Sequence, residues 1–169
     1  MAKHTDINLR SYTFYQVFPR QYSIEGTFNK VLEDLNRIKS MGVDMLYFLP
    51  IHPIGKKARK GEEGSPYSII DYYKISSDLG SLKDFQRLIE SAHEKDMKVM
   101  IDIVFNHTSR DSILVKEHPE WFYKNEAGEF ANRIGDWSDI TDLDFRNREV
   151  WDYLIDVLVY WAKIVDGFR

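Results

Sequence analysis

The sharpest cluster of reactive side chains lies in the stretch DIVFNHT, where Asp102 is followed by Asn106 and His107. Asp102 interrupts an otherwise apolar run, and a buried carboxylate costs several kcal/mol unless a cation or several donors pair with it. We therefore predict that Asp102 is paired, with an arginine from a neighbouring strand as the expected partner. The stretch alone leaves a second interpretation open, in which Asp102 is purely structural and His107 is an unrelated loop residue.

Two further stretches carry polar side chains at suggestive spacings. SPYSIIDYYKI places Tyr67 in a glycine-bearing loop and Asp71 four residues later, although surface loops rich in tyrosine are common. In WSDITDLDFRNREV, three carboxylates alternate just before a predicted helix: Asp139, Asp142 and Asp144. Carboxylates at this position complement a helix dipole. The same oxygens, together with Asn106, would also suit a hard cation such as Ca²⁺.

Composition excludes several classes of function. The 169 residues are 43% hydrophobic and 30% charged, which is typical of one soluble globular domain. The net charge of −4 provides no basic field for nucleic acid, and the absence of cysteine excludes disulfides and thiolate chemistry. The polar start MAKHTDINLR has no apolar signal core, and no run approaches the roughly 20 apolar residues of a membrane span. We expect a cytoplasmic protein with no membrane partner.

The elements that must position these side chains alternate between short apolar runs and amphipathic stretches. Strands are predicted at 12–18, 43–49 and 98–105, with a fragment at 165–169, and helices at 27–42, 81–97 and 147–164. Strands that are apolar on both faces and are followed by helices indicate parallel βαβ units. We predict that the strands lie side by side in chain order, with the helices on one outer face.

Two connections are far longer than a minimal loop. One runs from His52 to Leu79, and the other, from Thr108 to Asp142, contains NEAGE, which is typical of a hairpin turn. Long loops that follow the C-terminal ends of parallel strands are where α/β barrels place their binding sites. Aromatic residues make up 14% of the chain, which suits either core packing or a cleft that binds sugar rings.

These pieces together resemble the alpha-amylase superfamily of glycoside hydrolases and transglycosidases along nearly the whole chain. The matching stretches are YQVFPRQYS, GVDMLYFLPIHPIG, SPYSIIDYYKI, GSLKDFQRLIESAHEKDMKVMIDIVFNHTS and DITDLDF, in family order. The resemblance implies an α/β fold, the N-terminal half of a TIM (β/α)8 barrel with a short inserted segment after the third strand. Residues 1–107 would form the first three βα units, 108–142 the inserted segment, and 143–169 a barrel helix and the start of the fourth strand.

The resemblance also implies roles for individual residues. Tyr67 matches the aromatic residue that stacks on the sugar at the cleaved bond, and His107 matches a histidine that hydrogen-bonds a hydroxyl of that sugar. Arg169 matches the arginine two positions before the catalytic nucleophile. Two aspartates would support the site, Asp102 and Asp71.

Calcium is the cofactor that the resemblance raises. Asn106 matches a residue that ligates calcium in many members, and Asp142 matches an aspartate that does so in some. Thr141 stands where many members have proline, and the inserted segment is short.

The implied chemistry is cleavage of α-glucan or malto-oligosaccharide bonds by a retaining mechanism, which uses two carboxyl groups roughly 5 Å apart. The resemblance places both groups beyond Arg169, so the chain has no expected catalytic residue, appears truncated, and should be inactive alone. The first alternative is a non-catalytic scaffold or partner subunit of the same superfamily, and a generic metal-binding α/β domain is another. Retention of Tyr67, His107 and Arg169 favours the enzyme. The bond specificity, and the choice among hydrolysis, transfer and isomerisation, stay open.

Two structural expectations follow from the resemblance. Tyr67, His107 and Arg169 should converge on one concave surface at the C-terminal ends of the strands. Asp102 should lie close beneath them as the partner of the Arg169 guanidinium, because each would otherwise be an unpaired buried charge. The open edges of a half-barrel should also drive self-association.

Overall fold

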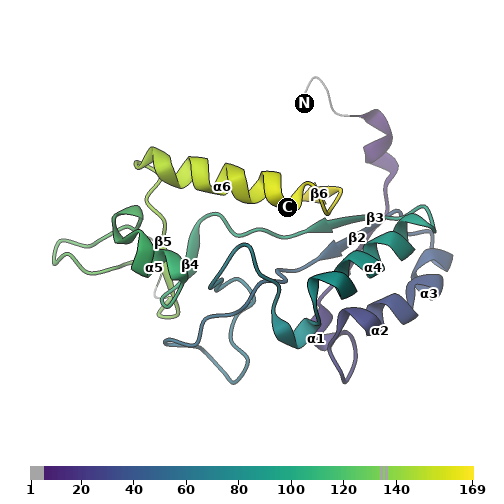
Figure 1. Cartoon of the computed structure of the whole chain (residues 1–169), viewed down its shortest axis with the longest axis horizontal. Coiled ribbons are helices and arrows are strands. Elements are labelled where there is room, and N and C mark those ends of the chain that lie inside the picture. Colours follow the sequence, from purple (N-terminus) through teal and green to yellow (C-terminus); the bar gives the residue numbers. More distant parts are fainter. Residues whose placement is uncertain (1–5, 134, 136) are drawn as a thin grey trace. The chain divides into compact units, whose positions relative to one another are not determined.

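The computed structural model describes residues 6–133, 135 and 137–169 (Figure 1). The chain divides into two units. Unit 1 contains Met1–Leu49, Asp78–Asp102 and Val165–Arg169, and unit 2 contains Pro50–Ser77 and Ile103–Ile164. The segment predicted as an insertion, 108–142, falls within unit 2 together with the long loop after the second strand. The predicted domain boundaries themselves stay a prediction.

Unit 1 is built on a parallel sheet of four strands in the order β1-β2-β3-β6. The strands are β1 (Phe14–Val17), β2 (Met45–Phe48), β3 (Lys98–Ile101) and β6 (Gly167–Phe168). Their C-terminal ends are aligned, because Val17 pairs with Phe48, Phe48 with Ile101 and Ile101 with Phe168. The predicted parallel order is confirmed, including the short strand at the end of the chain.

The strands are shorter than predicted, and the largest difference is at β3. It ends at Ile101 rather than at residue 105, so Asp102 directly follows the strand instead of lying inside it. The Asp102 amide still donates to the Phe48 carbonyl at 2.9 Å. Beyond that bond, Pro50 follows β2 and has no N–H, so the ladder is not continued by the neighbouring strand. Asp102 therefore lies at the edge where binding residues gather in such sheets.

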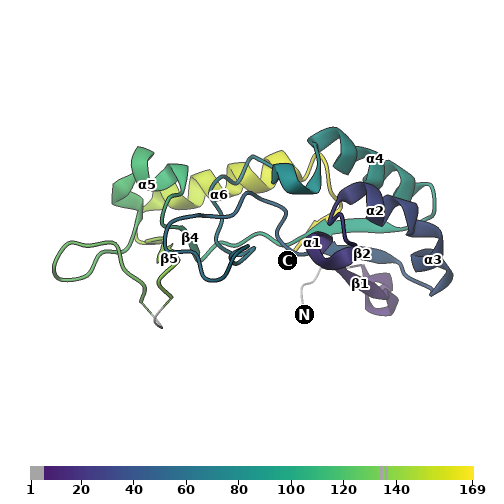
Figure 2. The same ribbon diagram turned by 90° about the horizontal axis from the view of Figure 1, so that it is seen from below.

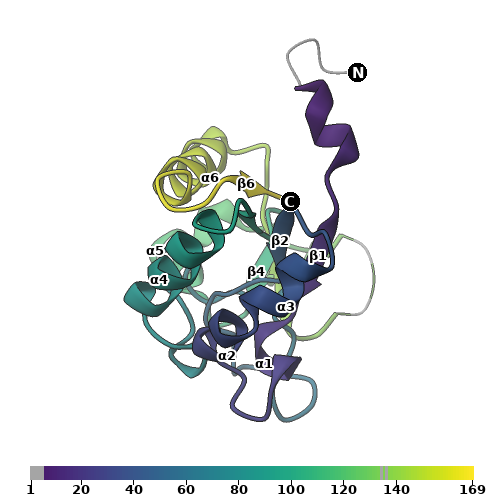
Figure 3. The ribbon, with the colours of Figure 1, turned by 90° about the vertical axis from the view of Figure 1, so that its right-hand side faces the viewer.

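Helices α2 (Phe28–Glu33), α3 (Leu35–Ser40) and α4 (Leu82–His93) lie along one face of this sheet (Figures 2 and 3). Three aromatic rings pack between the helices and the sheet. The ring centroids of Phe28 in α2 and Phe85 in α4 lie 6.3 and 5.6 Å from that of Phe48 in β2. Because side chains alternate along a strand, Tyr47 points to the opposite face, where it is only half-buried. The remaining short helices of unit 1 are η1 (Ile7–Ser11) and α1 (Pro19–Tyr22).

The predicted helix at 27–42 is wrong in one respect, because it is broken at Asp34 into α2 and α3. The Asp34 amide donates to the carbonyl of Val31, three residues back, and its carboxylate binds Arg37 and the hydroxyl of Tyr22. These local bonds tighten the turn and compete with a continuous helix. After α3, Gly42 adopts a φ of 79°, a left-handed conformation that suits glycine at the end of a helix. Ser81 caps α4 in a reciprocal bond pair with Asp84.

Unit 2 has little regular structure apart from one long helix, α6 (Arg148–Trp161). Its other elements are β4 (His107–Ser109), α5 (Ile113–Glu117), η3 (Pro119–Trp121) and β5 (Ile140–Asp142), and η2 (Ser77–Leu79) lies at the border with unit 1. β4 and β5 pair antiparallel, and the predicted hairpin is confirmed by the pairing of Lys124 with Phe130. Trp161 of α6 is fully buried and donates its indole N–H to the Tyr72 carbonyl at 2.7 Å.

Within the described part of the chain, no helix combines the length and the apolar character needed to cross a membrane.

The fully buried His52 makes the stability of unit 2 dependent on pH. Its Nδ1 lies 3.0 Å from the Lys74 carbonyl oxygen, and its ring packs against Trp161 at 5.4 Å between centroids. Burial lowers its pKa from 6.5 to about 4. The unfolded chain therefore binds a proton between these values that the folded chain does not, so stability falls as the pH drops from 6.5 toward 4.

We expect this histidine to account for about 3 kcal/mol of acid destabilisation, from a pKa lowered from 6.5 to about 4. His52→Gln keeps a donor for the Lys74 carbonyl but cannot take up the proton, so its urea-unfolding free energy should change less across this pH range. His118→Gln, at a partly exposed ring, is the matched control. Equal pH dependence in wild type and His52→Gln would contradict the argument.

Candidate functional site

The first group of predicted site residues lies in unit 1, where strands β3 and β6 end side by side. Asp102 is 3% exposed, and its Oδ2 accepts hydrogen bonds from Arg169 at 2.7 Å and from the Tyr47 hydroxyl at 2.8 Å. The backbone holds the pair in place, since the Arg169 amide donates to the Ile101 carbonyl at 3.0 Å. The predicted pairing of Asp102 with an arginine of a neighbouring strand is thus confirmed.

Tyr47 is a member of this group that the sequence did not single out. Its hydroxyl binds Asp102, and the Arg169 guanidinium lies 5.9 Å from its ring centroid. The Arg169 side chain is 60% exposed. Its guanidinium is therefore accessible to solvent, although it forms an ion pair with the buried Asp102. The alternation of side chains along MLYF put Tyr47 on the open face, but only the register of β2 with β3 showed what it would touch.

The second group lies in unit 2, around His107 at the start of β4. His107 pairs in register with Asp142 of β5, and its Nδ1 lies 3.2 Å from the Asn106 amide nitrogen. A hydrogen bond joins the imidazole to the Tyr67 backbone. The structure therefore brings together Tyr67, Asn106, His107 and Asp142, which the sequence placed in three separate stretches.

The environment of His107 favours the neutral form of its imidazole. Burial lowers the pKa of His107 below its ordinary value, and the carboxylates of Asp142 and Asp139 and the bond to the Tyr67 backbone oppose this only in part. A neutral imidazole carries one N–H donor and one acceptor nitrogen. That combination suits hydrogen bonding to a sugar hydroxyl, which is itself both donor and acceptor.

Trp137 extends this second group and was not assigned a role from the sequence. Its side chain is 52% exposed, which is unusual for so large an apolar ring, and its indole lies edge-on to His107 at 6.2 Å between centroids. An exposed aromatic face beside a neutral hydrogen-bonding group is the usual composition of a sugar-binding surface. The signal available from sequence was only the presence of a tryptophan in the long connection.

Asp71 takes a local role. It is buried, its Oδ1 accepts from the Tyr73 amide at 2.9 Å, and its Oδ2 forms an ion pair with Lys74 at 3.1 Å. These contacts fix the turn that follows the Tyr67 loop. They fit the predicted supporting role without placing Asp71 against the other site residues.

The two predicted calcium ligands are neighbours, with the Asn106 amide nitrogen 3.3 Å from Asp142 Oδ1. The other carboxylate oxygen of Asp142 accepts from the Arg133 amide at 2.8 Å and lies 3.4 Å from Arg133 Nε. Among the described residues, no group of three or more His, Asp or Glu side chains could hold a metal. A cationic guanidinium on the carboxylate does not fit a calcium site, so calcium binding stays a prediction of the resemblance that this donor set opposes.

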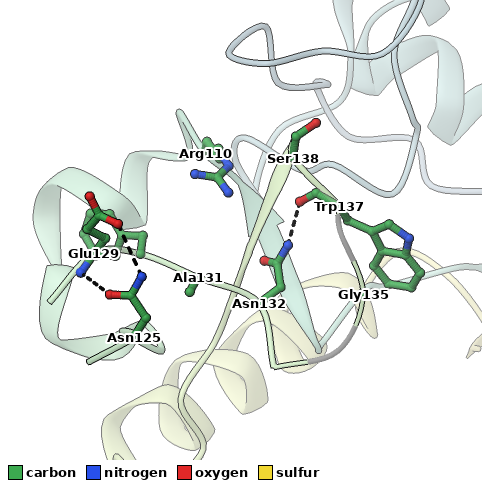
Figure 4. A pocket seen from close by; sticks show the side chains of 9 residues that line it. Arg110, Asn125, Glu129, Ala131, Asn132, Gly135, Trp137 and Ser138 are labelled. Atoms are coloured by element: carbon green, nitrogen blue, oxygen red, sulfur yellow. Dashed lines mark hydrogen bonds between the residues drawn. The ribbon is translucent and has the colours of Figure 1, made fainter. Parts of the chain in front are cut away.

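Figure 4 shows a hollow of about 430 Å³ in unit 2, lined mostly by polar side chains. Asn125 and Glu129 are hydrogen-bonded to each other on one side, and Asn132 donates to the Trp137 carbonyl at 2.6 Å on another. Arg110 is another of the residues that line the hollow. This volume is at the lower end of the range of about 300–1,000 Å³ for small-molecule sites. The polar lining matches a polyhydroxyl ligand better than an apolar one.

The described carboxylates that are buried are all engaged by cations of the chain. The pairs are Asp71 with Lys74, Asp102 with Arg169, Asp139 with Lys60, and Asp142 with Arg133. A general acid in glycoside cleavage is instead a carboxyl group whose surroundings favour the protonated form. These four carboxylates therefore have the surroundings of structural groups. The predicted convergence of the Arg169 and His107 groups on one surface stays a prediction.

Comparison with known proteins tests the predicted family and fold. The family described as the alpha amylase catalytic domain matches residues 11–120. The crystal structure of an alpha-amylase from Lactobacillus plantarum is 54% identical, with a TM-score of 0.93 over 95% of this chain and 38% of its own. That of a noncanonic maltogenic alpha-amylase, AmyB, from Thermotoga neapolitana is 40% identical, with a TM-score of 0.89 over 96% of this chain and 39% of its own.

A curated relative has a different activity in its name. The alpha-1,4-glucan:maltose-1-phosphate maltosyltransferase of Picrophilus torridus is 36% identical over 89% of this chain and 26% of its own length. The chain thus spans about a quarter of this relative and somewhat more than a third of the two solved structures. The predicted fold, the N-terminal part of a TIM barrel, is confirmed by these matches. The chain belongs to the alpha-amylase family, within its catalytic domain.

Proposed function

We propose that the protein carrying this chain cleaves α-glucan or malto-oligosaccharide bonds by the retaining mechanism with two carboxyl groups. The observation that supports this most is the 54% identity to an alpha-amylase over nearly the whole chain, combined with the His107 group that suits sugar hydroxyls. In this proposal Tyr67 stacks on the sugar at the cleaved bond and His107 hydrogen-bonds one of its hydroxyls. The nucleophile and the acid/base come from elsewhere in the barrel.

Arg169 and Asp102 have a positioning role in this proposal. The guanidinium is fixed by Asp102 and by the ladder bond of its own amide, and it presents a positive charge at the strand ends. A cation next to a catalytic carboxylate favours the ionised form that a nucleophile requires. Tyr47 assists by holding the same carboxylate oxygen from the open face of the sheet.

Glycosyl transfer is the second candidate, because the Picrophilus torridus relative is named as a maltosyltransferase. The two activities differ in what accepts the sugar, water or another glucan chain. Incubating the protein encoded by the complete gene with malto-oligosaccharides, with and without maltose 1-phosphate, distinguishes them. Hydrolysis releases reducing ends, whereas transfer from maltose 1-phosphate lengthens glucan and releases phosphate. If neither activity is detected, the non-catalytic scaffold becomes the better interpretation.

We expect residues 1–169, purified alone, to release no reducing sugar from maltotetraose above background. The proposed catalytic carboxyl groups are not among its residues, and loss of such groups lowers rates by many orders of magnitude. The sheet edges at β1 and β6 should also drive self-association, seen by light scattering as a mass above the 20.0 kDa of one chain. The complete protein is the positive control, and turnover by 1–169 would contradict the proposal.

In the complete protein, we expect Trp137→Ala to raise KM for malto-oligosaccharides roughly tenfold, because an aromatic face for the sugar is lost. Trp137→Phe should retain most of the affinity. Trp151→Ala removes another partly exposed indole, from α6, and is the matched control. An unchanged KM in Trp137→Ala would exclude this ring from the binding surface.

The ion pair at the strand ends should respond asymmetrically to mutation. Arg169→Met leaves the buried Asp102 carboxylate without this cation and should lower the unfolding free energy by about 1–3 kcal/mol. Asp102→Asn keeps a partner for Tyr47 and lets the exposed guanidinium rehydrate, so its cost should be smaller. Lys30→Met, which breaks exposed pairs with Glu25 and Glu33, should change stability least. The reverse order in urea unfolding would show that the carboxylate does not depend on Arg169.

A further inference from the structure

The Asp142 carboxylate lies in surroundings that demand a positive charge. It is 4% exposed and belongs to β5, whose three residues are all buried. A buried carboxylate is tolerated only when a cation or several donors compensate for its lost hydration. The identity of that cation decides whether the segment after β4 needs a metal ion.

Arg133 supplies the charge from within the chain. Its backbone amide donates to Asp142 Oδ2 at 2.8 Å, and its Nε lies 3.4 Å from the same oxygen. Its terminal Nη2 donates to the carbonyl of Leu143, the residue after Asp142, at 3.1 Å. One arginine therefore satisfies a carboxylate oxygen and the adjacent main-chain oxygen together.

These acceptors are of the kind that a hard cation would use. Calcium takes carboxylate, amide and main-chain carbonyl oxygens at about 2.3–2.6 Å. Arg133 engages the Asp142 carboxylate and the Leu143 carbonyl, while Asn106 turns its amide nitrogen toward Asp142 Oδ1. A guanidinium and a calcium ion would compete for the same oxygens, and two cations this close would repel each other.

The contact also fixes the hairpin that lies between η3 and β5. The Asp142 amide donates to the Ala131 carbonyl at 3.3 Å, and the Tyr123 amide donates to the Asp142 carbonyl at 2.9 Å. Arg133 lies two residues after Ala131, so its bonds to Asp142 and Leu143 extend this backbone pairing with a charged one. The two strands of the hairpin are thereby attached to β5.

We propose that Arg133 is a built-in cation that takes the place of a calcium ion at Asp142 and attaches the 122–133 hairpin to β5. The site then needs no metal in the wild-type protein. Removing the guanidinium takes the side-chain donor away from Asp142 Oδ2, which keeps its bond to the backbone amide of residue 133, and it frees the Leu143 carbonyl. The vacated position then becomes accessible to calcium. The proposal does not depend on the enzymatic activity.

The test is the thermal midpoint of the protein encoded by the complete gene, measured in EDTA and in millimolar calcium. Arg133→Ala should lower the midpoint by a few degrees in EDTA, and calcium should restore part of the loss. Arg133→Lys keeps a positive charge and should be intermediate, with a weaker calcium response. Magnesium should restore little, because it requires a tighter octahedral ligand set.

Two controls make the result specific to Asp142. Adding Asp142→Asn to Arg133→Ala should abolish the restoration by calcium, even if the complete protein binds calcium elsewhere. Arg146→Ala removes a more exposed guanidinium, paired with Asp144, and should gain no calcium response. The proposal is overturned if the wild type already shows a calcium response that Asp142→Asn removes, or if Arg133→Ala leaves the midpoint unchanged.

Discussion

The need to compensate buried carboxylates determines how the irregular parts of this chain are held. Four aspartates are buried among the described residues, and each has a cation within 4 Å: Lys74, Arg169, Lys60 and Arg133. Only the Asp71 pair is local. The Asp102 pair joins residues 67 apart in sequence, and Lys60 and Asp139 bring the loop after β2 to the segment after β4. Ion pairs therefore connect segments that are distant in sequence, in regions where the strands are short.

The register of the strands decides which side chains meet at the strand ends. The parallel strands of unit 1 end level with one another, so the first residue after β3 and the last residue of the chain meet. In unit 2, the antiparallel register places His107 opposite Asp142, whose charge opposes the lowering of the His107 pKa by burial. The neutral form of the histidine is favoured because burial is the stronger effect. The surroundings of His107 thus depend on the backbone pairing of β4 with β5.

Local sequence signals were sufficient for the helical segments predicted at 81–97 and 147–164 and for the order of the strands, but not for the helix predicted at 27–42. The helix predicted at 81–97 corresponds to α4, which Ser81 and Asp84 cap, and the apolar runs marked each strand of the parallel sheet. The break at Asp34 was missed because the periodicity of apolar residues continues across it. The bonds of Asp34 at the break include one to the Tyr22 hydroxyl of α1, which lies outside the stretch that was read as one helix.

The site could be predicted only in part, because some of its contacts join distant parts of the sequence. An arginine partner for Asp102 could be predicted because an isolated charge in an apolar run demands a partner, whereas Arg169 itself was named from the family resemblance. Tyr47, Trp137 and Arg133 were missed because their side-chain types are unremarkable in their own stretches. Only the register of β2 with β3 and the folding of the long connection give them their partners.

The proteins that this chain is similar to carry names of different activities. This chain aligns with amylases and with a maltosyltransferase at 36% identity or more, although their names imply different acceptors for the transferred sugar. In the proposed function, this region of the barrel holds the sugar unit at the cleaved bond. The His107 group has the donor, acceptor and aromatic surface for that step, while the buried carboxylates are engaged in structural pairs. The choice between water and a glucan chain as acceptor would then be made by groups outside the residues that these proteins share with this chain.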